Sequence, residues 1–120
     1  MRYYFRCLTL LLTLAGNASI HAASATYLLV PGQPLLISNS LSHPVSASCL
    51  MHAALNVVNS ISIKMIQGNG LFNGTSIQRG DTLYQNILNS QYIPLIASNN
   101  ASAIITNLSP YTIQAECIMT

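Results

Sequence analysis

Charged side chains are scarce in this 120-residue chain, which has four Lys or Arg, two Asp or Glu, and no Trp. Past residue 25 the charges cancel, since the only charged side chains are Lys64, Arg79, Asp81 and Glu116. Proteins that bind nucleic acid neutralise several phosphates with Lys and Arg, so the composition excludes that class. It also argues against electrostatic docking to a membrane surface. Because a near-neutral surface favours association, we expect a protein partner or self-assembly.

The patterns of catalytic and metal-binding residues are missing as well. Asp81 lies in a predicted turn and Glu116 on the outer face of a predicted strand, so they do not form a hydrolytic carboxylate pair. No serine lies in a nucleophile motif; His43 precedes Pro44 in a predicted turn and His52 lies at a predicted strand end. The soft or imidazole ligands lack the spacing of a copper or zinc site; they are His43, Met51, His52, Met65, Cys117 and Met119. We therefore expect no catalytic residues, no metal and no cofactor.

The first 22 residues have the layout of a secretory signal peptide. Arg2 and Arg6 precede a nine-residue apolar run at 7–15, and small residues follow at 16–22. The run is too short to span a bilayer. We predict cleavage after Ala22, with cleavage after Ala25 as the alternative. The mature protein is then exported to the periplasm, the cell surface or the medium, and it is not transmembrane. Residues 23–120 form one domain.

Cysteine is also scarce, and its number predicts one disulfide. Of the three cysteines, the first lies within the predicted signal peptide, so the mature chain retains Cys49 and Cys117. Two cysteines in an exported chain pair with each other. Closing so long a loop stabilises the fold by about 4 kcal/mol in the chain-entropy treatment.

Two segments 68 positions apart read alike. Residues 37–51 and 105–119 both follow the pattern I-[ST]-N-x5-[VI]-x-A-x-C-[LI]-M. We interpret this internal repeat as two equivalent strand–turn–strand units with a cysteine at the same point of each. In both units the cysteine alternates with Ala and Val or Ile, so both sulfurs are expected to face inward.

Short alternating segments separated by turn residues predict seven or eight strands and no convincing helix. A short helical turn at 51–58 is the alternative for that segment. Pro94 lacks a ladder donor, which predicts an edge strand over 92–98. Asn73-Gly74 predicts a tight hairpin turn. The predicted strands cover 26–30, 35–39, 44–51, 60–66, 82–88, 92–98, 101–106 and 111–119.

These strands predict an all-β fold, a small antiparallel β-sandwich tied by the Cys49–Cys117 disulfide. In strand number and cysteine spacing the chain resembles immunoglobulin-like sandwiches of Greek-key type. That resemblance implies a disulfide between the two sheets, which ties an early strand to a late one. The chain departs from the immunoglobulin pattern because it has no Trp to pack on the bridge.

Two functions fit an exported, non-enzymatic sandwich. The first is a structural or protein-interaction module, such as an envelope-machine component, appendage subunit or adhesin-like protein. It would pair through strand edges, with 26–30 as one contact. The second is a freely secreted binding module that recognises a host or carbohydrate ligand through its loops. For that surface we predict Phe72, Asn73, Arg79, Gly80 and Asp81, the last three being a tripeptide that integrins recognise. A small metal-binding or hydrolytic protein is a distant third hypothesis.

Overall fold

The computed structural model describes residues 24–120, so the predicted signal peptide lies outside the described residues. This part of the chain forms ten strands and no helix. The strands are β1 (Ser24–Leu29), β2 (Pro34–Ser38), β3 (Val45–His52), β4 (Asn59–Gln67), β5 (Asn69–Phe72), β6 (Thr75–Gln78), β7 (Thr82–Ile87), β8 (Gln91–Ala97), β9 (Ser102–Asn107) and β10 (Ile113–Met119).

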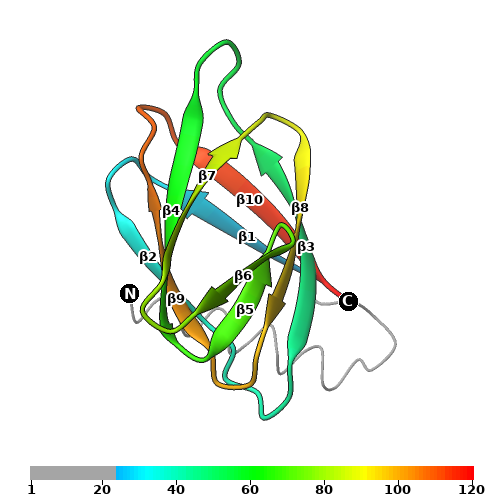
Figure 1. The fold of residues 1–120 in the computed structure, drawn as a ribbon. Helices are drawn as coiled ribbons and strands as arrows, with labels where there is room; N and C mark the ends of the chain where they lie inside the picture. Colours follow the sequence, from blue (N-terminus) through cyan, green and yellow to red (C-terminus); the bar gives the residue numbers. More distant parts are fainter. Residues whose placement is uncertain (1–23) are drawn as a thin grey trace.

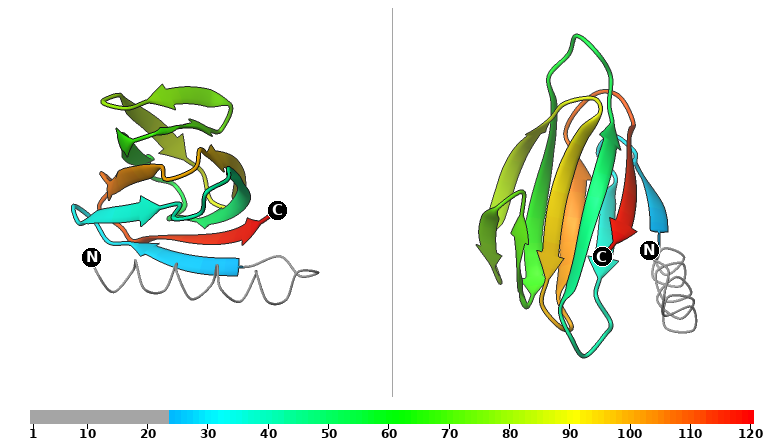
Figure 2. Two further views of the ribbon diagram at one scale, coloured as in Figure 1. Left: turned by 90° about the horizontal axis from the view of Figure 1, so that it is seen from below. Right: turned by 90° about the vertical axis from the view of Figure 1, so that its right-hand side faces the viewer.

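The strands form two antiparallel sheets that face each other (Figures 1 and 2). The six-stranded sheet has the order β1-β10-β3-β8-β5-β6, and the four-stranded sheet has the order β2-β9-β4-β7. Without the β5–β6 hairpin, each sheet has four strands in the order of a jelly roll. The predicted all-β sandwich with one disulfide is therefore confirmed. The strand order differs from that of an immunoglobulin domain. There the first two strands are neighbours in one sheet, whereas here β1 and β2 lie in different sheets.

Alternating side chains place the core between the sheets. In β4 the inward residues are Ile61, Ile63 and Met65, all at most 6% exposed, while Ser62 and Lys64 point away from the core. In β3 the two most buried residues are Cys49 and Met51. These are the faces that the alternation predicts, because successive side chains of a strand point to opposite sides.

The hairpin between β5 and β6 adds two strands to the expected number. Its two-residue turn is Asn73-Gly74, with φ angles of 50° and 84°. Such positive angles at both positions are typical of a type I′ turn, so the predicted tight hairpin is confirmed. Asn69 and Gly70, in a Gly-Asn-Gly segment typical of turns, already belong to β5. The four-residue strands were too short to stand out as alternating segments.

One local alternative and one local expectation are wrong. The segment after β3 is a loop and not a helical turn, and Asn56 within it has a φ of 63°. The strand β8 lies inside its sheet, since it pairs with β3 along its whole length and with β5 from Leu95 to Ala97. The carbonyl of Pro94 accepts a hydrogen bond from the Asn73 amide at 2.9 Å, just past the end of β5. The N–H group that proline lacks would point to this same side of β8, where β5 has already ended. Pro94 is therefore tolerated, because no strand at this position needs its donor.

The disulfide lies within one sheet, which corrects the expectation of a bridge between sheets. Cys49 of β3 and Cys117 of β10 are directly opposite each other in neighbouring strands, and their Cα atoms are 3.9 Å apart. Both are less than 10% exposed, so the predicted inward direction is confirmed. The bridge therefore ties an early strand to the last one without crossing the core.

The two similar segments occupy matching places, with β2 paired to β9 and β3 paired to β10. An asparagine begins each connecting loop in the same way. The Asn39 amide donates to the His43 carbonyl and accepts from the Leu41 amide, both at 3.0 Å. The Asn107 amide likewise donates to a carbonyl four residues on and accepts from an amide two residues on, both at 2.8 Å. The shared Asn of the pattern thus organises both loops.

Candidate interaction surface

Four loops meet at one end of the sandwich, and we call this set of residues 30–33, 53–58, 88–90 and 108–112 the loop end. Hydrogen bonds join these loops to one another and to the adjoining strands. The Ala53 amide donates to the Asn89 side chain at 3.0 Å, and the Gly32 amide donates to the Asn107 carbonyl at 2.8 Å. The Leu108 amide donates to the Ser60 carbonyl at 2.9 Å. In Figure 1 the loop after β3 stands at the top of the molecule.

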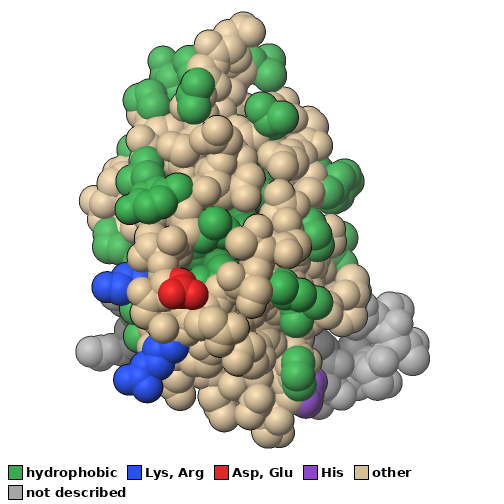
Figure 3. Space-filling model, viewed as in Figure 1, with side chains coloured by type: hydrophobic (Ala, Val, Ile, Leu, Met, Phe, Trp, Pro, Cys, Tyr) green, Lys and Arg blue, Asp and Glu red, His purple; other side chains and the backbone are tan. Residues whose placement is uncertain are grey.

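Large apolar side chains are concentrated on the loop end. Half of the fourteen exposed large hydrophobic residues of the described chain lie in these four loops. Figure 3 shows hydrophobic side chains around this upper end. Isolated exposed hydrophobics are ordinary, but a gathered set marks a surface that another molecule covers. The seven residues are Val30, Leu55, Val57, Val58, Leu88, Leu108 and Tyr111.

The loop end itself carries no charged side chain. Lys64, Arg79 and Asp81 lie toward the opposite end, where Figure 3 shows blue and red atoms together. Glu116 lies on the outer face of β10, where its carboxylate contacts the His52 imidazole. Interface cores are depleted of charge, and the loop end shares that depletion.

Buried asparagines give the loop end a defined shape. Asn107, 1% exposed, donates to the Leu29 carbonyl at 2.7 Å and so joins the first and last loops. Asn59, 2% exposed, donates to the Ala54 carbonyl at 2.8 Å and holds the start of the 53–58 loop. A surface held in place before binding loses less conformational entropy when a partner docks.

The residues predicted for a binding loop do not form one surface. Phe72 is 7% exposed and packs in the core, so its ring is not available to a ligand, and that assignment is wrong. The sequence favours a loop at this position because β5 has only four residues, too few to show alternation. Asn73 is exposed in the hairpin turn, and Arg79, Gly80 and Asp81 are exposed in the next turn. The Asp81 carboxylate accepts from the Gln78 amide at 2.9 Å, which is ordinary turn chemistry.

Sequence reasoning missed the apolar residues of the loop end. The loop residues Leu55, Val57 and Val58 were assigned to a helical turn or left without a role. The available signal was the presence of large apolar residues beside Asn, Ser and Pro in 88–90 and 108–112, and of three large apolar residues around Asn56 in 53–58. Turn residues are usually polar, so apolar ones at turn positions are informative.

The sheet edges are β1 and β6 in the larger sheet and β2 and β7 in the smaller one. The predicted contact strand at 26–30 belongs mostly to β1, which pairs along its full length with β10. It can therefore offer only its outer edge to a partner. Between residues 24 and 120, no three His, Cys, Asp or Glu residues cluster as a metal site would require. The same part of the chain contains no apolar helix of membrane-spanning length.

Comparisons with known proteins find likeness in the fold only. No family model and no curated protein matches the chain. CENP-C of Drosophila melanogaster, in a structure bound to CAL1, is 10% identical with a TM-score of 0.48, over 81% of this chain and 63% of that one. A cupin protein of Desulfovibrio desulfuricans is 18% identical with a TM-score of 0.35, over 72% and 71%. The Yersinia pseudotuberculosis-derived mitogen is 11% identical with a TM-score of 0.36, over 82% and 84%. These similarities indicate nothing about function.

Proposed function

We propose that the protein is exported and works without catalysis, as an interaction module whose loop end docks onto a partner protein. The observation that carries this proposal is the gathering of seven exposed apolar side chains on an end without charge. Covering exposed apolar surface of this kind with a partner is favourable, because the apolar side chains are removed from water. The rigid loops and the neutral surface favour association over solvation.

Export is supported by the layout of residues 1–22 and by the disulfide. Bridges between cysteines persist in oxidising compartments and are rare in the cytosol. The His52–Glu116 pair is about half exposed on the outer face of β3 and β10, and no serine of the sequence lies in a nucleophile motif, which supports a non-enzymatic role.

The test compares variants of equally exposed residues. Leu55 and Val58 of the loop end are 69% and 77% exposed, and Tyr84 on β7 is 70% exposed. The double variant Leu55→Ser/Val58→Ser and the control Tyr84→Ser are both expected to change the free energy of unfolding by only about 0.5 kcal/mol per site. The native protein is extracted from the producing cells and sized by light scattering.

We expect a particle larger than one chain for the wild type and for Tyr84→Ser, and a single chain for the double variant. Interface truncations at central apolar positions commonly weaken binding by about 2 kcal/mol or more, enough to dissociate a moderate complex. The composition of the particle, from mass spectrometry, distinguishes copies of this chain from a second protein. A monomeric wild type, or a double variant that keeps the particle intact, contradicts the proposal.

The alternative function is a secreted binding module that uses the exposed turn at Arg79, Gly80 and Asp81. It is favoured by the concentration of charge there, since that turn holds two of the four charged side chains beyond residue 25. A monomeric protein that loses binding to cells or glycans on Arg79→Ala, and keeps it with the loop-end variant, would support this alternative.

A further inference from the structure

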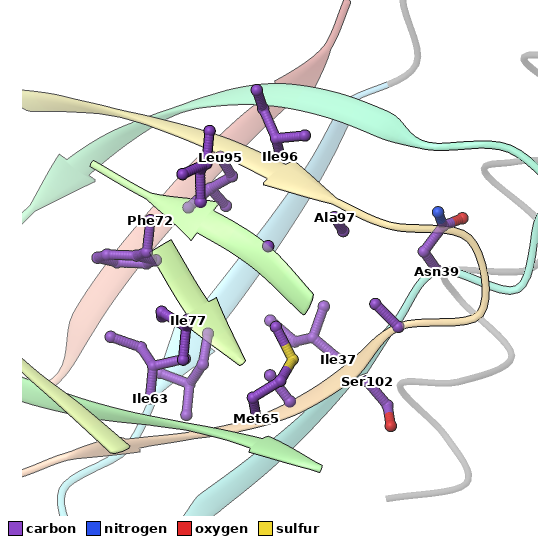
Figure 4. Close-up of a pocket in the computed structure, with 15 residues that line it drawn as sticks. Ile37, Asn39, Ile63, Met65, Phe72, Ile77, Leu95, Ile96, Ala97 and Ser102 are labelled. Carbon is purple, nitrogen blue, oxygen red and sulfur yellow. The ribbon is translucent and has the colours of Figure 1, made fainter. Parts of the chain in front are cut away.

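Unfilled space lies between the sheets, and its two larger parts lie away from the loop end. Two cavities of about 100 Å³ and one of about 30 Å³ adjoin one another there. Ile37 of β2 and Leu95 of β8 line all three, so these two facing side chains separate the cavities. Figure 4 shows the residues around one large cavity, and Figure 3 shows apolar atoms recessed in the middle of one face.

Small residues leave this space open. Ala47, Ala97 and Ala103 line one or both of the larger cavities, each on a different strand. Nearer the loop end, Ile87 and Ile113 are at most 1% exposed and line none of the three cavities. The space between the sheets is thus open to solvent at one end, with an almost entirely apolar lining. Concave apolar pockets of this kind are typical of ligand sites.

The chemistry of the lining selects an uncharged apolar occupant. None of the residues around the three cavities is Lys, Arg, Asp, Glu or His. The Asn39 amide at the rim is already engaged, because it donates to the carbonyls of His43 and Ser98, both at 3.0 Å. A water molecule needs two to four polar partners and finds few here, whereas an apolar cavity of about 150 Å³ can take up benzene.

We infer that this end of the sandwich binds a slim, uncharged apolar group, of which a straight alkyl chain is the simplest example. Because Ile37 and Leu95 line all three cavities, movement of either side chain would join neighbouring cavities into a longer space, which suits a flexible chain better than a rigid ring. The inference is independent of the proposed docking at the loop end, because the two surfaces share no residue.

The test titrates the oxidised, full-length exported protein with straight-chain primary alcohols from butanol to decanol. Binding is followed by calorimetry and by the NMR shifts of alanine methyl groups. We expect saturable binding of one molecule per chain, with affinity rising about fourfold for each added methylene until the space is filled. The methyl signals of Ala47, Ala97 and Ala103 are expected to shift most.

A cavity-filling variant and a matched control make the inference falsifiable. Ala97 lines both larger cavities, so Ala97→Ile should weaken binding by about fifteenfold, equivalent to two lost methylenes. The control Ala54→Ile lies in the loop end and should leave the affinity unchanged. If Ala97→Ile does not fold, Ala47→Val and Ala103→Val each fill one larger cavity by a smaller amount. Binding that does not saturate, shifts centred on the loop end, or unchanged affinity in the filled variants would overturn the inference.

Discussion

Replacing Asn107 with Ala is expected to destabilise the fold strongly, because this buried side chain joins three segments. Its amide donates to the Leu29 carbonyl at 2.7 Å and to the Tyr111 carbonyl at 2.8 Å. Its side-chain oxygen accepts from the Ser109 amide at 2.8 Å and from the Ser109 hydroxyl at 2.6 Å. The residue is only 1% exposed, so water cannot replace these bonds.

The magnitude follows from the number of bonds that the substitution leaves without a partner. Each net hydrogen bond contributes about 1 kcal/mol, and a buried group left unpaired costs more. The Ser109 hydroxyl also donates to the Tyr111 carbonyl at 2.9 Å, so this hydroxyl and this carbonyl remain hydrogen-bonded to each other in the variant. We therefore expect Asn107→Ala to lower the free energy of unfolding by about 3–4 kcal/mol. For a domain of this size, that is a fall in Tm of roughly 12–30 °C.

Asn39→Ala provides a control within the same molecule. Asn39 makes the same two local contacts, but it has one bond fewer and is 7% exposed, so solvent can reach part of the site. We expect a loss of about 2 kcal/mol. The assay is urea unfolding of the oxidised protein followed by circular dichroism. A smaller loss for Asn107→Ala than for Asn39→Ala, or a loss below about 1 kcal/mol, would refute the reasoning from burial and bond number.

Three further predictions follow from the disulfide, the first strand and the core. Replacing both Cys49 and Cys117 with Ala should lower the free energy of unfolding by about 4 kcal/mol, because the bridge closes a separation of 68 residues, and urea titration measures the loss. The mass of the exported protein should correspond to a start at Ala23. A cut after Ala25 would remove Ala25 itself, which is 8% exposed and pairs with Cys117 between β1 and β10. A mass that lacks residues 23–25 would contradict this prediction. Phe72→Ala should lower the free energy of unfolding by about 3–5 kcal/mol, whereas Arg79→Ala, at an exposed position, should lower it by about 0.5 kcal/mol or less in the same assay. A loss for Phe72→Ala as small as that for Arg79→Ala would show that the Phe72 ring is not buried.

Several structural features could be predicted from local sequence because their causes are local. The alternation in 60–66 and 44–51 predicts which side chains face inward, since the strand period is two everywhere. The Asn73-Gly74 pair predicts its own hairpin turn through the positive φ angles that these residues tolerate. The cysteine count predicts one bridge, and the structure contains it.

The candidate site could not be predicted because it consists of loops that are distant in sequence. Residues 30–33, 53–58, 88–90 and 108–112 share one end only because of the jelly-roll order of the strands. The apolar residues within each loop are few, and they become a surface only when the loops meet. Likewise, each alanine of the cavity lining is unremarkable by itself, and the cavity exists because several strands place alanines together.

The strand faces, the hairpin turn, the cysteine pair and the scarcity of charge follow from the sequence, because each depends on neighbouring residues or on composition. Which strands become neighbours depends on the fold as a whole. That choice put the disulfide within one sheet, placed Pro94 in an interior strand and buried Phe72. The physical reason is that strand pairing is made by backbone groups common to all residues, so the partner is selected by packing of the whole core and not by any local pattern.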